Sequence, residues 1–156
     1  MKQIAVVGLG NPLLKDDGIG PRVVRELQKT GMPPGVRAVE AGGVLWSYWN
    51  LLRECRHVIA VDCMQGGGPA GAVYLMGLEQ LNKIETGAGS DAWIGHELHF
   101  LDALKLAAHY GVRPEVTIIG VEPGEISFSL ELSPVIEARL PRLVEIVRER
   151  CWCLMR

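Results

Sequence analysis

The sequence lacks the features that would assign it to several special classes of protein. Its four cysteines contain no C-x-x-C pair, which argues against a structural zinc site. Its 16 lysines and arginines do not outnumber its 18 acidic residues, so no basic face for nucleic acid is indicated. Its 19 glycines follow no period of three, which excludes collagen. The longest uncharged apolar stretch, residues 41–52, is about half of a membrane span.

What is present is the composition of an ordinary globular protein. The chain has 156 residues, of which 48% are hydrophobic and 22% charged, so it can bury one sizeable core and is not disordered. We expect a single domain over residues 1–156. The first ten residues hold too few apolar side chains for a signal-peptide core. The sequence therefore predicts a soluble, cytoplasmic protein whose cysteines stay reduced.

Apolar runs alternate with helical patterns, which is typical of βαβ units. The predicted fold is α/β: a three-layer α/β/α sandwich of about five mostly parallel strands. One strand follows its predecessor too closely for a helical crossover and is expected as an antiparallel edge. The expected strands cover residues 4–7, 36–40, 57–61, 72–76 (the edge) and 116–121, and the expected helices cover 21–30, 44–54, 97–110 and 134–150.

Acidic residues follow two of the expected strands. Asp16 and Asp17 come after the glycine turn that ends the first strand, and Asp62 directly follows the apolar run 58–61. Helix capping can account for one acid of the pair, and loop capping can account for Asp62. Parallel strands, however, end at the same edge of a sheet, where functional groups gather. Asp17 and Asp62 are therefore expected to share one crevice.

Histidines supply a further candidate. His96 begins an expected helix after a glycine-containing stretch, and His99, one turn later, competes with it. His57 and His109 are expected at the other end of their elements and are discounted. Two carboxylates and an imidazole suit a borderline divalent ion such as nickel or zinc, and they suit acid–base hydrolysis equally well. The residues alone leave both chemistries open.

The same residues carry a resemblance to a known family. The motif Gly8-x-Gly10-Asn11-x-Leu13-x-x-Asp16-Asp17-Gly18-x-Gly20 resembles the N-terminal signature of the nickel–iron hydrogenase maturation endopeptidases. The resemblance extends over nearly the whole chain. Its further elements are Gly42-Gly43, Asp62, His96-x-Leu98 with Asp102 and Leu104, and Gly120-Val121-Glu122-Pro123.

The resemblance implies an enzyme that cuts the hydrogenase large-subunit precursor once and removes its C-terminal extension after nickel insertion. It implies that Asp17, Asp62 and His96 contact nickel, and that the nickel belongs to the substrate. Zinc or cadmium can take the place of nickel in a crystal. The hydrolysis is expected to be aspartic-type or metal-assisted, with Asp17 or Asp62 assisting the water. Asp16 is the alternative base.

Substrate contacts are expected from a glycine pair and two tryptophans. Gly42 and Gly43 have no side chains, so a substrate tail can approach their backbone closely. Trp46 and Trp49, at i and i+3, can line a groove. Core or interface packing is the alternative for both tryptophans. The expected partner is the large-subunit precursor, with no nucleic acid and no membrane insertion, and the chain is expected to be a monomer or weak homo-oligomer.

Two other functions compete with the protease. A nickel-binding checkpoint or carrier protein that does not cut the precursor would use the same three ligands. Peptidyl-tRNA hydrolases also begin with a strand followed by Gly-x-x-Asn-Pro, but they continue with a glycine and a histidine–asparagine pair. This chain has Leu13-Leu14-Lys15-Asp16-Asp17 there, and it lacks the basic surface that tRNA requires.

Overall fold

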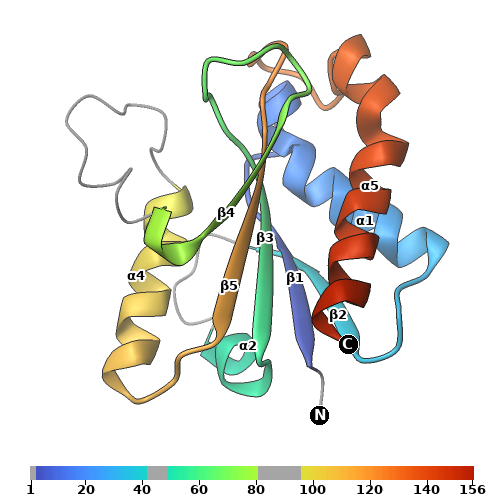
Figure 1. The fold of residues 1–156 in the computed structure, drawn as a ribbon. Coiled ribbons are helices and arrows are strands. Elements are labelled where there is room, and N and C mark those ends of the chain that lie inside the picture. Colours follow the sequence, from blue (N-terminus) through green and yellow to red (C-terminus); the bar gives the residue numbers. More distant parts are fainter. Residues whose placement is uncertain (1–2, 42–48, 81–95) are drawn as a thin grey trace.

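The fold is known from a computed structural model, which describes residues 3–41, 49–80 and 96–156, with the side chains of 96–99 left out (Figure 1). The elements in chain order are β1 (Ile4–Gly8), the 3-10 helix η1 (Lys15–Gly18), α1 (Ile19–Thr30), β2 (Val36–Glu40), α2 (Trp49–Glu54), β3 (His57–Cys63), β4 (Val73–Gly77), α4 (His96–His109), β5 (Glu115–Val121) and α5 (Pro134–Leu154).

The five strands form one sheet in the order β2-β1-β3-β5-β4. All neighbouring pairs are parallel except β4 with β5, so the predicted antiparallel edge strand is confirmed. The strand β1 lies between β2 and β3, and its last residue, Gly8, is level with Val61 of β3. The carboxyl ends of β1 and β3 therefore meet at one edge of the sheet.

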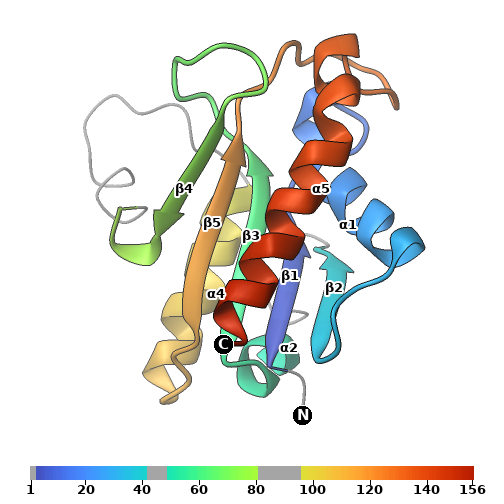
Figure 2. The same ribbon diagram turned by 45° about the vertical axis from the view of Figure 1, so that its right-hand side comes forward.

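Helices cover both faces of the sheet, which confirms the predicted three layers (Figures 1 and 2). Side chains of β1 point alternately to the two faces, as in any strand. Ile4 and Val6 pack in a cluster with α1 and α5, whereas Ala5 and Val7 pack in a second cluster with α2 and α4. Because β1 is buried on both sides, its sequence is a continuous apolar run.

Most elements begin or end within one residue of the expected boundary, and three differ in ways that matter for the packing. The helix α1 begins at Ile19, so that Pro21 falls in its first turn, where its missing N–H is tolerated. The strand β3 continues to Cys63, so Asp62 lies inside it and pairs with Gly120 of β5. The helix α5 continues to Leu154, because Cys151 is buried in the core.

Two expected segments fall partly outside the described residues. Only Trp49–Glu54 of the expected helix 44–54 is described, as α2, and residues 81–95 of the expected irregular stretch are outside. Among the helices that the structure describes, none is both long and apolar enough to cross a bilayer.

The burial of the cysteines predicts their reactivity. Cys55, Cys63 and Cys151 are buried and Cys153 is exposed. Burial raises the pKa of the Cys151 thiol to about 11 and also raises the pKa of Cys55, so both lack the reactive thiolate near neutral pH. We expect the native protein to react quickly with a chromogenic disulfide reagent at Cys153 alone, and the unfolded protein to react at all four cysteines.

The control for this labelling experiment is Cys153→Ser, which removes the fast phase if the assignment is correct. Rapid labelling of a second thiol in the native protein would contradict the burial of the other three.

Candidate active site

Glycines allow the start of α1 to press against the carboxyl ends of β1 and β3. A Cβ atom at Gly20 would clash with the carbonyl oxygens of Leu9 and Val61, and a Cβ at Gly8 would clash with the backbone of Gly20. No larger residue fits at these two positions without moving the helix away from the sheet. This close packing places the segment that carries Asp17 directly at the edge where β3 ends.

The backbone of Asp17 and the side chain of Asp62 both lie close to Gly10. This glycine has a φ of 123°, a conformation that other residues rarely adopt. A Cβ built on it would clash with the carbonyl oxygen of Asp17 and would lie 3.4 Å from Oδ1 of Asp62. The structure thus places the two acids near one another at the edge that the sequence predicted, and the absence of a side chain at Gly10 allows the backbone of Asp17 to come this close.

The two acids differ in their surroundings. Asp17 is half-buried, and its Oδ2 accepts a hydrogen bond from the N–H of Asn11 at 2.9 Å. Asp62 is fully buried, and its Oδ1 accepts a hydrogen bond from the N–H of Cys63 at 2.8 Å. Solvent therefore reaches Asp17, while Asp62 is held in an environment where a carboxylate is costly unless other groups or a cation compensate its charge.

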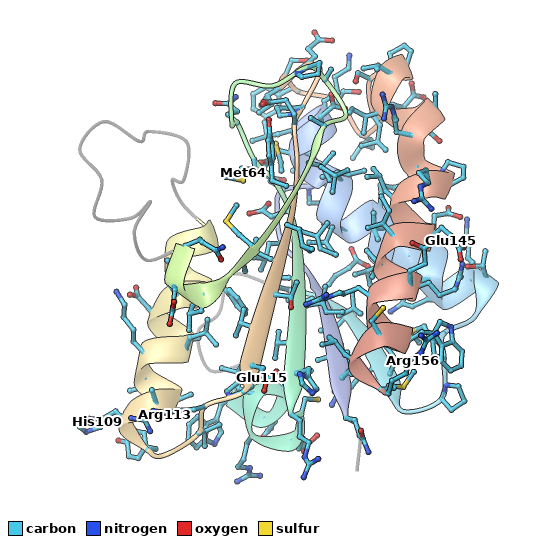
Figure 3. All side chains as sticks on the ribbon, viewed as in Figure 1. Met64, His109, Arg113, Glu115, Glu145 and Arg156 are labelled. Carbon is cyan, nitrogen blue, oxygen red and sulfur yellow. The ribbon has the colours of Figure 1, made fainter. Side chains whose placement is uncertain are left out.

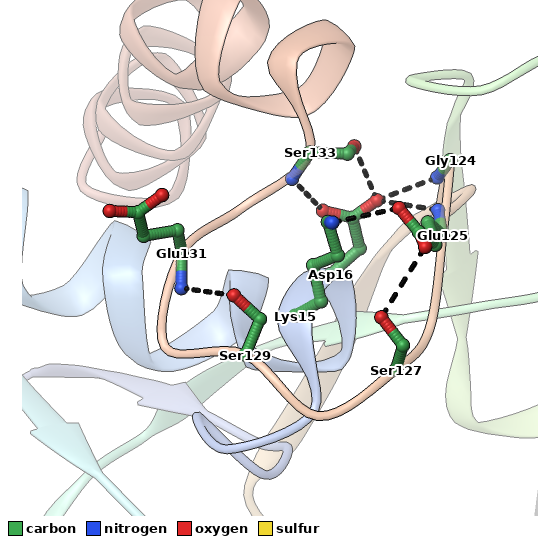
Figure 4. A network of polar contacts seen from close by, with 8 residues as sticks. All are labelled: Lys15, Asp16, Gly124, Glu125, Ser127, Ser129, Glu131 and Ser133. Atoms are coloured by element: carbon green, nitrogen blue, oxygen red, sulfur yellow. Dashed lines mark hydrogen bonds and ion pairs between the residues drawn. The ribbon is translucent and has the colours of Figure 1, made fainter.

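Asp16, the alternative base, has a different role. It is only 1% exposed, and four donors surround its carboxylate (Figure 4). Oδ2 accepts hydrogen bonds from the N–H groups of Gly124 and Glu125, both at 2.8 Å, and from the hydroxyl of Ser133 at 2.6 Å. Oδ1 accepts one from the N–H of Ser133 at 2.8 Å. Both oxygens are occupied and shielded from water, so Asp16 is a structural group and not the base.

Ser133 shows why this role was missed. It is the N-cap of α5, but its side chain makes no capping hydrogen bond to that helix. The hydroxyl donates to Asp16 instead. The sequence suggested that one acid of the pair caps the helix that follows it, whereas Asp16 binds the residue that precedes a helix 117 positions later.

Glu122 is a third buried carboxylate at this edge, beside Asp16 and Asp62, and it was assigned no role from the sequence. It follows β5, and its Oε1 accepts hydrogen bonds from the N–H groups of Gly66 and Gly68, at 2.9 and 2.8 Å, and from the Tyr74 hydroxyl at 2.7 Å. The bond to Glu122 raises the pKa of Tyr74. Glu122 thereby fixes the glycine loop that follows β3. An acid after an apolar strand, the signal used for Asp62, would also have found it.

The discounted histidines lie at the far end of the sheet. His57 begins β3, and its Nδ1 is 3.2 Å from a carboxylate oxygen of Glu115. Figure 3 shows His109 and Glu115 at the end of the sheet opposite Met64, which follows Asp62 by two residues. Cys63, beside Asp62, belongs to the buried core.

His96 begins α4, but its side chain and that of His99 lie outside the described residues. Among the side chains that the structure describes, which do not include that of His96, no three His, Cys, Asp or Glu residues are grouped so as to hold a metal ion.

The predicted substrate contacts are only partly described. Gly42, Gly43 and Trp46 lie outside the described residues. Trp49, in α2, packs edge-on against Tyr110, with ring centroids 5.7 Å apart and an interplanar angle of 80°. Tyr110 directly follows α4 at the end of the helix opposite His96. Trp49 therefore has the packing role that the sequence left as the alternative, and substrate binding by these four residues stays a prediction.

The hydrogen bonds of Asp16 predict a large loss of stability in Asp16→Asn. The amide would turn an N–H₂ group toward buried donors that need an acceptor, at a cost of about 3 kcal/mol in the free energy of unfolding. For a chain of this length, Tm should fall by roughly 6–12 °C in a thermal melt. The matched control is the exposed Glu131→Gln, which should melt like the wild type. An unchanged Tm in Asp16→Asn would show that the network is dispensable.

The chain is similar to known proteins over most of its length. The sequence model of the family described as hydrogenase maturation protease (HycI) matches residues 21–150. The hydrogenase expression/formation protein HupD of Rhodobacter capsulatus is 27% identical over 97% of this chain and 73% of its own length, a region that includes the motif before residue 21.

Solved structures of hydrogenase maturation proteases have a similar fold. The hydrogenase maturating endopeptidase HybD from Escherichia coli superposes with a TM-score of 0.79 at 26% identity, over 93% of this chain and 89% of that one. The hydrogenase 2 maturation peptidase from Thaumarchaeota archaeon SCGC_AB-539-E09 has a TM-score of 0.70 at 32% identity, over 96% and 98% of the two chains. The chain belongs to the hydrogenase maturation protease family.

Proposed function

We propose that this chain is an endopeptidase that removes the C-terminal extension of a nickel-loaded nickel–iron hydrogenase large-subunit precursor. The observation that carries the proposal is that Asp17 and Asp62 both lie close to Gly10, at the carboxyl ends of β1 and β3. Membership of the maturation protease family supports peptide-bond hydrolysis and the hydrogenase precursor as substrate.

In this proposal the nickel ion is part of the substrate and serves as a recognition handle. Asp17, Asp62 and His96 offer two carboxylates and an imidazole, a donor set that suits nickel and leaves positions for the precursor's own ligands. The burial of Asp62 supports its share in the site, because a bound cation compensates a carboxylate that water does not reach. A peptide without the metal would lack this interaction, so the enzyme would cut only precursors that have received nickel.

The two acids are suited to different parts of the hydrolysis. Asp17 is half-buried and within reach of solvent, so we assign it the proton of the attacking water. Water oxygen then bonds to the scissile carbonyl carbon, the C–N bond breaks, and the leaving amine takes up the proton. Asp62, fully buried, holds its charge facing the metal. The substrate's nickel, when present, adds polarisation of the carbonyl.

Nickel dependence tests the proposed function directly. Purified protein is incubated with nickel-loaded and with nickel-free precursor, and the large subunit is followed by mass spectrometry. We expect time-dependent loss of the C-terminal extension from the loaded precursor only. Equal cleavage of both forms would reject nickel recognition, and binding of the loaded form without any cleavage would support a non-cleaving checkpoint protein instead.

Substitutions of the proposed ligands give the second test. Asp17→Asn and Asp62→Asn should each slow precursor processing by roughly a hundredfold or more, since each removes a charge that contacts the metal or the water. A thermal melt of each variant separates this effect from unfolding. His96→Ala should also lose activity, whereas the matched His99→Ala should keep it. Wild-type processing by Asp62→Asn, or equal processing by the two histidine variants, would contradict the assignment.

A further inference from the structure

A group of exposed apolar side chains lies beside the Asp17 segment. We call it the apolar strip and define it as Leu13, Ile126, Phe128 and Leu130. Their exposed fractions are 53%, 42%, 89% and 74%, and none of them belongs to either core cluster. Large apolar side chains that lie together on a protein surface often mark an interaction site.

The loop that carries most of the strip is fixed to the active-site segment. Asp16 binds its beginning, at Gly124 and Glu125, and its end, at Ser133 (Figure 4). Between these points the backbone of Ser129 exchanges two hydrogen bonds of 3.0 Å with the segment 13–15. Phe128 and Leu130 are therefore held in place on both sides, so little ordering entropy is lost when a partner covers them.

The polar residues of the loop are used internally. Glu125 forms an ion pair with Lys15 at 2.7 Å, the Ser127 hydroxyl donates to Glu125, and the Ser129 hydroxyl accepts from the N–H of Glu131. These residues alternate with Ile126, Phe128 and Leu130 along the chain. The loop thus satisfies its polar groups by itself and leaves the apolar side chains outward.

The cations nearest to the apolar strip do not make it a binding site for acidic ligands. Leu130 lines a hollow with Arg22 and Arg25 of α1, and these two arginines form ion pairs with Glu137 and Glu40, at 3.1 and 2.9 Å. What the surface offers a partner is therefore apolar contact, which fits a protein surface rather than nucleic acid.

We propose that the apolar strip docks an apolar patch on the folded part of the large-subunit precursor and so positions the cleavage segment at Asp17. The identity of the partner rests on the proposed function. The closeness of the strip to the active site supports this partner. Lys15, whose N–H donates to the carbonyl oxygen of Ser129, lies two residues before Asp17. A molecule whose scissile bond reaches Asp17 must cover the strip or pass beside it.

The double variant Phe128→Ser with Leu130→Ser tests this docking surface. Initial cleavage rates are measured against precursor concentration, and binding of the same precursor to the immobilised enzyme is measured separately. We expect KM and Kd to rise roughly tenfold to a hundredfold, as for the loss of central apolar anchors, with kcat retained. The matched control is Leu75→Ser with Trp152→Ser, which removes two other exposed apolar side chains, 57% and 48% exposed, from β4 and the end of α5.

The outcomes separate the docking surface from the proposed function. If the wild type cuts the precursor and the double variant has an unchanged KM and Kd, the docking surface is wrong and the protease stands. If the wild type binds the precursor through the strip without cutting it, the docking surface stands and the protease is wrong. If sedimentation shows a wild-type dimer that the double variant converts to a monomer, the strip is a contact between two copies and the proposal is overturned.

Discussion

The buried carboxylate of Asp16 joins three segments that are far apart in the chain. Its four hydrogen bonds connect the 3-10 helix η1, the loop that follows β5 and the first residue before α5 (Figure 4). The position of Asp17, one residue later, depends on this connection, and so does the fixed presentation of Phe128 and Leu130. A carboxylate that accepts hydrogen bonds from backbone N–H groups is well suited to this task, because charge-assisted bonds are short and strong.

The four acids at one edge of the sheet therefore fall into two pairs with different roles. Asp16 and Glu122 are buried acceptors of backbone N–H groups, and they fix the loops on the two sides of the site. Asp17 and Asp62, one reached by solvent and one fully buried, are the pair that we propose acts on the substrate. Without the two structural acids, the loops that carry or border the other pair would have to be ordered by the substrate itself, at a cost in affinity.

The fold followed from the sequence because its signals are local. Continuous apolar runs predicted the buried parallel strands, and the short connection before residue 73 predicted the antiparallel edge. Element ends were less accurate: α5 is longer than expected because Cys151 still packs in the core, and β3 includes Asp62 because Gly120 pairs with it. Such extensions depend on neighbours from other parts of the chain, which spacing along the sequence does not reveal.

By itself, the sequence determined that Asp17 and Asp62 lie at one edge of a parallel sheet, because residues that follow adjacent parallel strands share an edge. It also determined that glycines surround them. Only the tertiary structure decided which acid of the Asp16–Asp17 pair faces the site. Ser133, one partner of Asp16, is 117 residues away and directly precedes α5, the last element of the chain. Two adjacent aspartates look alike in a sequence, and the difference between them is made by the segments that fold against one and leave the other open.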